Sequence, residues 1–93
     1  MIKSFRDKTT RAVYEGNVPK GFPKDVANRA LDKLRQIERA MNLGDLSIPP
    51  GNHLEALSGR RKGQFSIRIN RQWRVCFEWR DGDAWNAEIA DYH

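Results

Sequence analysis

Hydrophobic and polar residues alternate through the last third of the chain. In FSIRINRQWRVCF, residues 65–77, apolar side chains stand at every second position on both sides of a polar break, Asn70-Arg71-Gln72. Successive side chains of a strand point to opposite faces of a sheet, so a period of two predicts strands with one buried face. The pattern predicts strands over residues 64–69, 73–80 and 84–91, with HLEAL, residues 53–57, as a further short strand.

Two earlier segments follow the helical period instead. Asp7–Glu15 is predicted to be a short helix, with Asp7 as its N-cap and Gly16 as its stop. A longer helix is predicted over about residues 24–42, with Pro23 in its first turn and Gly44 after its end. Its apolar residues form one stripe: Val26, Ala27, Ala30, Leu31, Leu34, Ile37 and Met41. This stripe is predicted to be core, and a groove for a partner is the alternative.

These elements predict a single α+β domain over residues 1–93. Two N-terminal helices would pack on one face of a mainly antiparallel β-sheet, in two layers. The opening residues, MIKSF, read as a short additional strand.

The turn lengths determine which side chains face each other across the sheet. A three-residue loop at Asn70-Arg71-Gln72 keeps the buried faces in phase and sets Arg68 opposite Arg74. The second turn is predicted to have three residues as well, Asp81-Gly82-Asp83, so that Arg80 stands opposite Ala84. The pairs that follow from this register are Trp79 with Trp85, Glu78 with Asn86, Phe77 with Ala87, Cys76 with Glu88, Val75 with Ile89, and Arg74 with Ala90.

The Arg68–Arg74 pair needs an explanation, because like charges directly across a ladder cost roughly 0.2–1 kcal/mol unless something neutralises them. One interpretation is neutralisation by Glu88 or another carboxylate. The other is a cationic floor that binds a phosphate group. Both interpretations stay open on the sequence.

The chain ends in Asp91-Tyr92-His93, close to both arginines in the predicted register. A frayed terminus is the plain interpretation. The alternative is phosphodiester cleavage: His93 titrates near neutrality, Tyr92 can stack on a base or position a hydroxyl, and Asp91 can orient His93 or accept a proton. The two arginines would then stabilise charge that develops on the scissile phosphate.

Composition adds a basic character to this picture. The 93 residues carry a formal net charge of +5 with a pI near 9.8, which suits nucleic acid, an anionic membrane or an acidic protein as a partner. The loop SGRRKGQ holds Arg60, Arg61 and Lys62 between two glycines, either as a solvated turn or as a phosphate contact. Arg71, in the first hairpin loop, is a further candidate for RNA contact.

The same sequence argues against several other classes of protein. One cysteine, Cys76, allows no internal disulfide and suits a reducing cytosol. Two histidines and one cysteine without metal-ligand spacing predict neither a metal nor a cofactor. No apolar run approaches ~18 residues, and MIKSFRDK lacks the apolar core of a secretion signal, so a cytoplasmic protein without a membrane span is expected.

Three motifs together resemble one known family. The runs PPGNHLEALSG and GQFSIRINRQWRVCFEW, with the terminal DYH, are similar to the HigB toxins of bacterial toxin–antitoxin pairs, within the RelE-like superfamily. The resemblance covers essentially the whole chain. It implies a RelE-like fold, with helices against a curved antiparallel sheet. It also implies a metal-independent endoribonuclease that cleaves mRNA, typically on the translating ribosome, through attack of the RNA's own 2′-hydroxyl on the neighbouring phosphate.

The resemblance also implies roles for individual residues. Arg68 and Arg74 match the basic positions on the phosphate side, and Asp91, Tyr92 and His93 match the functional C-terminal end. Some relatives have a histidine where this chain has Glu55, so Glu55 or the nearby His53 is the candidate for a second acid or base. His53 as a loop residue without chemistry is the alternative.

The family further implies a cognate HigA-like antitoxin of helix-turn-helix type, with operator DNA contacted only through that partner. Two other functions compete with mRNA cleavage. One is inhibition of DNA gyrase by binding, as in ParE-type toxins of similar fold, which needs no acid or base. The other is a non-catalytic RNA-binding module.

Overall fold

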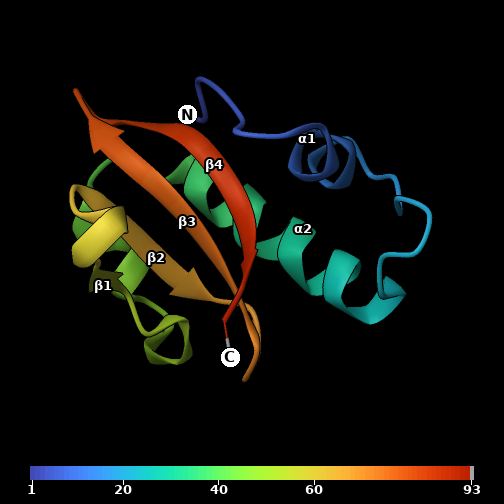
Figure 1. Cartoon of the computed structure of the whole chain (residues 1–93). Coiled ribbons are helices and arrows are strands. Elements are labelled where there is room, and N and C mark those ends of the chain that lie inside the picture. The colour runs from blue at the N-terminus through green and yellow to red at the C-terminus, as the bar shows by residue number, and fades with distance from the viewer. Residues whose placement is uncertain (93) are drawn as a thin grey trace.

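Two helices cover one face of a four-stranded antiparallel sheet in the computed structural model, which describes residues 1–92 (Figure 1). The strands follow the chain order β1-β2-β3-β4 across the sheet. This arrangement confirms the predicted α+β class. The elements are α1 (Lys8–Tyr14), α2 (Lys24–Arg39), β1 (Glu55–Ala56), β2 (Gln64–Arg68), β3 (Trp73–Arg80) and β4 (Asp83–Asp91).

The first helix begins where its sequence predicts. The Asp7 carboxylate accepts a hydrogen bond from the Thr10 amide at 2.7 Å, which satisfies one of the free N–H groups of the first turn. Glu15 is the C-cap, and Gly16 follows with a φ of +92°, a conformation that glycine adopts without steric cost. The sequence prediction for α1 is therefore confirmed within one residue.

The second helix ends earlier than its periodicity predicts. Ala40 is already extended, with a ψ of 133°. The Asp45 carboxylate accepts from the amides of Met41 and Asn42, at 3.0 Å each, and starts a 3₁₀ turn over Leu43–Ser47. This capping box draws the chain out of the helix, so Gly44 is not its end. Met41 is 80% exposed, and its prediction as a core residue is wrong.

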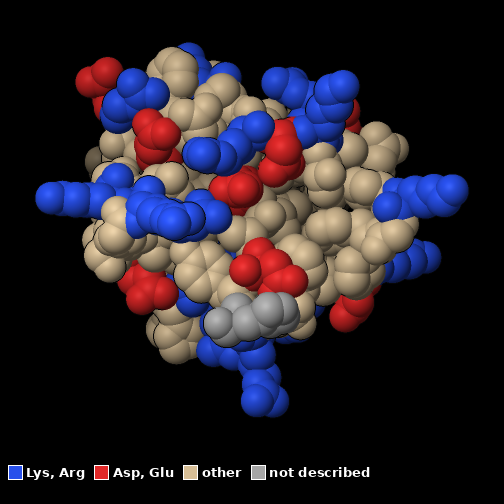
Figure 2. Space-filling model, in the orientation of Figure 1, with Lys and Arg blue, Asp and Glu red and all other residues tan. Residues whose placement is uncertain are grey.

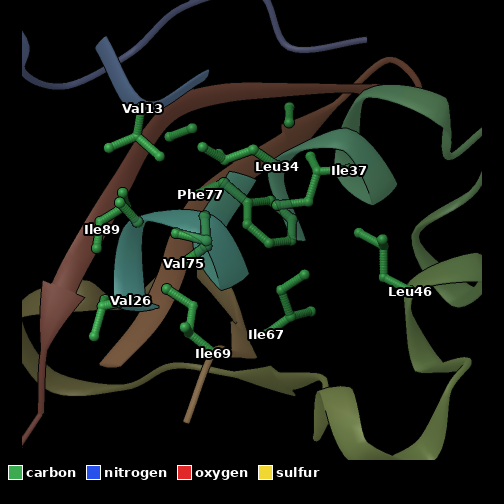
Figure 3. Packing of buried hydrophobic residues seen from close by; sticks show 14 of the residues in the cluster. Val13, Val26, Leu34, Ile37, Leu46, Ile67, Ile69, Val75, Phe77 and Ile89 are labelled. Atoms are coloured by element: carbon green, nitrogen blue, oxygen red, sulfur yellow. The ribbon is translucent and has the colours of Figure 1, made fainter. Parts of the chain in front are cut away.

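The core lies between α2 and the sheet (Figure 3). Leu34 and Ile37 of α2 meet Ile67, Val75 and Phe77 of β2 and β3, and all five are completely buried. The apolar stripe of α2 is therefore used within this chain, and the alternative of a partner groove along it is wrong. No helix within residues 1–92 has the length and apolarity needed to cross a membrane.

The hairpin between β2 and β3 has the predicted register. Phe65 pairs with Phe77, and Arg68 pairs with Arg74. The side-chain oxygen of Asn70 accepts from the amides of Gln72 and Trp73, at 2.8 Å each, and closes the turn. An Asx-type turn of this kind is the structural role expected of Asn at this position.

The hairpin between β3 and β4 has the predicted register only in its half nearer the C-terminus. There Arg74 pairs with Ala90, and Cys76 with Glu88. A bulge then sets two residues, Asn86 and Ala87, against the single residue Phe77. The pairs beyond the bulge are shifted by one residue from the prediction: Glu78 with Trp85, Trp79 with Ala84, and Arg80 with Asp83.

The shift has a local cause in the turn. Asp81 and Gly82 have φ values of +54° and +79°, and form a two-residue turn in place of the predicted three-residue loop. Asp-Gly pairs favour such turns because their twist matches that of the flanking strands. Asn86 takes up the extra residue with a φ of +54°, which asparagine tolerates better than most residues.

The N-terminal residues run beside β4 without forming the predicted strand (Figure 1). Ile2 and Phe5 make isolated parallel bridges to Ala84 and Ala87. The bulge in β4 separates these two bridging positions and interrupts a regular ladder. The segment nevertheless covers the β4 edge of the sheet.

Shortening a buried side chain of α2 and an exposed one just after its end should change stability by very different amounts. Leu34→Ala should lower the free energy of unfolding by about 2–5 kcal/mol, because it leaves a cavity in a fully buried site. Met41→Ala should change it by less than about 0.5 kcal/mol, since that side chain faces solvent. Urea denaturation of both variants measures the difference. A comparable loss for Met41→Ala would contradict the observed end of α2.

Candidate active site

A cleft of about 500 Å³ opens at the end of the sheet where the β2–β3 turn and the end of β4 meet. Strand alternation places Arg68, Arg74 and Tyr92 on the same face, away from the helices. β1 and the loop before it close the other side. The cleft is lined by His53, Glu55, Arg68, Asn70, Arg71, Arg74 and Tyr92, which brings together six of the candidate residues named from the sequence.

Arg74 is the most firmly held cation in the cleft. Its Nε donates to the Ser66 hydroxyl at 2.7 Å, and its Nη2 donates to the His53 carbonyl at 2.6 Å. The same Nη2 lies 3.2 Å from Oε1 of Glu55. Only 13% of the Arg74 side chain is exposed. The neutralising carboxylate left open by the sequence is therefore Glu55, and Glu88 is engaged elsewhere.

Arg68 and Arg71 complete the cationic side of the cleft. The Nε of Arg68 donates to the carbonyl of Asn70 at 3.1 Å, which folds this side chain toward the turn. Arg71 is exposed at the tip of the same turn. The cleft thus has one cation tied into the fold and two at its rim.

A buried asparagine holds the loop that carries His53. Asn52 is fully buried, and its side-chain oxygen accepts from the ammonium group of Lys33 on α2 at 2.6 Å. Its amide nitrogen donates to the Gln36 side chain at 3.0 Å and to the Leu46 carbonyl at 3.1 Å. His53 follows with a φ of +46° and turns its carbonyl toward Arg74. Sequence reasoning missed Asn52, because its partners come from α2 and from the chain before it.

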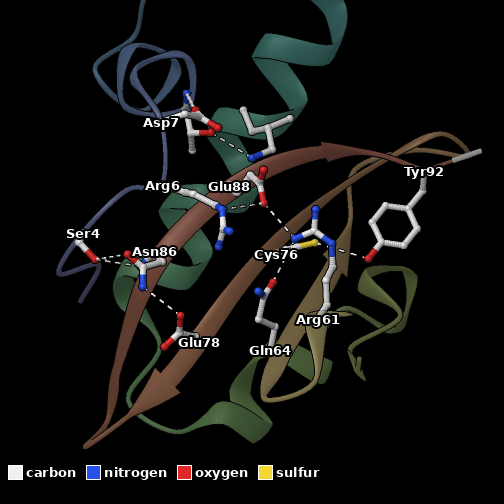
Figure 4. Close-up of polar contacts among 12 residues, drawn as sticks. Ser4, Arg6, Asp7, Arg61, Gln64, Cys76, Glu78, Asn86, Glu88 and Tyr92 are labelled. Carbon is white, nitrogen blue, oxygen red and sulfur yellow. Dashed lines mark hydrogen bonds and ion pairs between the residues drawn. The ribbon is translucent and has the colours of Figure 1, made fainter. Parts of the chain in front are cut away.

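Tyr92 lies over the sheet and covers Cys76 (Figure 4). The Cys76 thiol donates to the Tyr92 hydroxyl at 3.8 Å. Burial raises the pKa of the Cys76 thiol, and the Tyr92 hydrogen bond opposes that rise. Burial also raises the pKa of Tyr92, with the neighbouring Cys76 as the next cause. Tyr92 is therefore a neutral phenol at physiological pH.

Arg61 differs from its neighbours in the basic loop. Its Nη1 donates to Glu88 at 2.9 Å and to Gln64 at 3.1 Å, and the guanidinium carbon lies 5.9 Å from the centre of the Tyr92 ring (Figure 4). The Glu88 hydrogen bond raises the pKa of Arg61. Arg61 therefore braces the outer face of the sheet, whereas Arg60 and Lys62 are exposed.

The last three residues do not all reach the cleft. Asp91 pairs with Trp73 and so lies on the face of the sheet opposite to Arg74. Both oxygens of its carboxylate accept from the Gln72 amide nitrogen at 3.1 Å, and Asp91 does not line the cleft. His93 lies outside the described residues. Within residues 1–92, no group of three or more His, Cys, Asp and Glu side chains is arranged to hold a metal ion.

The arrangement of two helices on a four-stranded antiparallel sheet defines an α+β fold class that this chain shares with a solved structure. A chain of the "YoeB-YefM complex from Staphylococcus aureus" matches this structure with a TM-score of 0.61 and 18% sequence identity, over 100% of this chain and 98% of that one. At this identity the match shows a shared fold.

Sequence comparisons then identify the family. Residues 3–93 match the family model described as the RelE-like toxin of the type II toxin–antitoxin system HigB. The chain is 40% identical to "Toxin HigB-1" of Vibrio cholerae, over 96% of this chain and 95% of that protein. It is 36% identical to "Endoribonuclease HigB" of Proteus vulgaris, over 100% of both. This chain belongs to the HigB-like toxin family.

The buried thiol predicts a loss of stability at alkaline pH. Because the pKa of Cys76 is raised on folding, the folded protein holds this proton more tightly than the unfolded chain does. That stabilisation is complete below about pH 8.5, the pKa of an unperturbed thiol, and is lost as pH rises through the higher folded-state pKa. Chemical denaturation at about pH 7.5 and about pH 10 should therefore show a smaller alkaline loss for Cys76→Ala than for the wild type. Equal losses would contradict the raised pKa.

Proposed function

We propose that this HigB-like toxin is an endoribonuclease that cleaves mRNA on the translating ribosome. The observation that carries the proposal is the cationic cleft, in which Arg68 and Arg74 converge with Tyr92 and Glu55. Support comes from the Proteus vulgaris relative, which is similar along its full length and is named an endoribonuclease. Cleavage of mRNA would stop translation and account for toxicity.

The proposed reaction is attack of a 2′-hydroxyl on the adjacent phosphate. A base removes the hydroxyl proton as the new P–O2′ bond forms. The P–O5′ bond then breaks, an acid supplies a proton to the departing 5′-oxygen, and the products are a 2′,3′-cyclic phosphate and a 5′-hydroxyl. Arg68 and Arg74 would stabilise the charge on the phosphoryl oxygens. These steps require no cofactor.

Glu55 is the best-placed base among the residues that line the cleft. In the free protein its carboxylate lies 3.2 Å from Arg74, in the place where a phosphate oxygen would bind. An incoming phosphate competes with Glu55 for that guanidinium and releases a carboxylate beside the reacting hydroxyl. Tyr92 keeps its proton and can stack on a base or donate to the phosphate. His93 is proposed as the acid, with His53 as an alternative.

The proposed partners follow from this role. The substrate is mRNA on the ribosome, and the exposed cations Arg60, Lys62 and Arg71 would contact RNA phosphates. A HigA-like helix-turn-helix antitoxin would neutralise the toxin in the cytoplasm and would provide the contact with operator DNA. Gyrase inhibition is the second candidate, and it requires neither the acid nor the base of the cleft.

Mapping of mRNA ends tests cleavage directly. Primer extension on RNA from cells expressing the wild-type toxin should show discrete new 5′ ends inside coding regions. Arg74→Ala should lower cleavage by about 10²–10³-fold, because a preorganised cation is lost. Arg74→Lys, the matched control for charge, should recover only part of the activity, since lysine lacks the planar fork. Intact mRNA accompanied by double-strand DNA breaks would support gyrase inhibition instead.

Glu55→Gln separates a base from a simple counter-ion. The amide should free Arg74 and tighten RNA binding, while removal of the base slows cleavage by about 10²–10⁴-fold. Single-turnover cleavage on programmed ribosomes measures both effects. Glu78→Gln is the matched control, because this carboxylate pairs with Arg80 and Asn86 away from the cleft. Cleavage at the wild-type rate by Glu55→Gln would rule out the proposed base.

A further inference from the structure

A second cavity continues from the candidate active site onto α2. It has a volume of about 680 Å³ and shares His53, Arg68, Asn70 and Arg71 with the first cleft. Its remaining lining comes from the outer side of α2, the loop before His53, and the end of β2. These residues are Asn28, Arg29, Asp32, Lys33, Gly51 and Ile69. We call this second cavity the α2 groove.

Cations dominate the α2 groove. Arg29 and Lys33 are four residues apart and therefore lie on the same side of α2, opposite Arg68 and Arg71. Among the described residues 1–92, the single carboxylate in the lining is that of Asp32, which accepts from the Gln36 side chain at 3.0 Å. Four cations therefore face one carboxylate that already has a hydrogen-bond partner.

The two α2 cations differ in how they are held. The Lys33 ammonium donates to Asn52 at 2.6 Å, so its position is linked to the loop that presents His53 to Arg74. Arg29 is exposed, and its guanidinium can reach a ligand that enters from solvent. Figure 2 shows Lys and Arg side chains projecting around the edge of the molecule, with carboxylates in the middle of that face and also between the cations at the edge. Charge at the rim favours approach of an extended polyanion.

We propose that the α2 groove is a subsite for the RNA strand next to the scissile phosphate, with Arg29 as its main phosphate contact. The inference rests on the proposed function, because the strand must continue from the cleft. Arg68 and Arg71 line both cavities, so a single strand can pass from one to the other without leaving the cationic wall. Asn28 and Asn70 add amide groups that can bond to sugars or phosphates.

The α2 groove should bind RNA without reading its sequence. Phosphate contacts position a strand, whereas stacking and base-edge contacts specify it. Within residues 1–92, no Phe, Tyr or Trp lines the groove, and its one aromatic ring, the imidazole of His53, stands where the groove meets the candidate active site. Loss of the Arg29 side chain should therefore weaken the binding of all RNA substrates by a similar factor.

Substitution of Arg29 tests the subsite. Arg29→Ala should raise KM about threefold to tenfold and leave kcat unchanged, because a binding contact away from the reacting phosphate is removed. The slope of log affinity against log salt concentration should fall by about 0.7, the value for one phosphate contact with a single strand. Arg35→Ala is the matched control: it removes the same charge from an exposed position on α2 that does not line the groove. This control should keep the wild-type KM and salt slope.

Truncated messages make the test independent of general charge effects. The experiment uses ribosomes programmed with a series of shortened mRNAs. In one half of the series the 5′ end, and in the other half the 3′ end, lies progressively closer to the cleavage site. On one side, truncation should abolish the difference between wild type and Arg29→Ala, because the contacted phosphate is gone. If the difference persists on every truncated message, the proposed subsite is wrong.

The remaining outcomes separate this proposal from the proposed function. A wild-type toxin that cleaves mRNA, with Arg29→Ala indistinguishable from Arg35→Ala, overturns only the subsite. If the toxin binds RNA through Arg29 but does not cleave it, only the proposed endoribonuclease activity is overturned. If Arg29→Ala weakens antitoxin binding and leaves RNA binding intact, the groove binds a protein partner, and the RNA subsite is overturned.

Discussion

The candidate active site depends on how the guanidinium of Arg74 is held. Its acceptors come from three parts of the chain: Ser66 on β2, the His53 carbonyl in a loop, and Glu55 on β1. These contacts offset the repulsion expected from Arg68 directly across the ladder. Because Arg74 is almost enclosed, it is preorganised, and an anion that binds it need not first order a flexible side chain.

Much of the fold could be predicted because local patterns determine it. Alternation along β2 and β3 set which residues face the core, and Asp7 marked the start of α1. The pairing of Arg68 with Arg74 followed from the phase of the buried residues and needed no knowledge of distant contacts. The family resemblance then placed candidate residues at the same end of the sheet.

What could not be predicted arises from contacts between segments far apart in the sequence. Asn52 reads as an ordinary loop residue, yet it is buried, and its side chain bonds to Lys33, to Gln36 and to the carbonyls of Leu46 and Ile48. Arg61 reads as a solvated cation of the basic loop, but Glu88 holds it against the sheet. In each case a polar side chain finds partners only after folding, and neither periodicity nor spacing records them.

The bulge in β4 has a consequence for how this structure can vary. It separates the hairpin into two parts with independent registers, one ending at the Asp81-Gly82 turn and the other at the cleft. An insertion or deletion of one residue near the turn can be absorbed at Asn86, where the ladder is already irregular. Evolutionary change in length at the far tip of the sheet need not displace the arginines, so that tip is free to diversify while the cleft keeps its geometry.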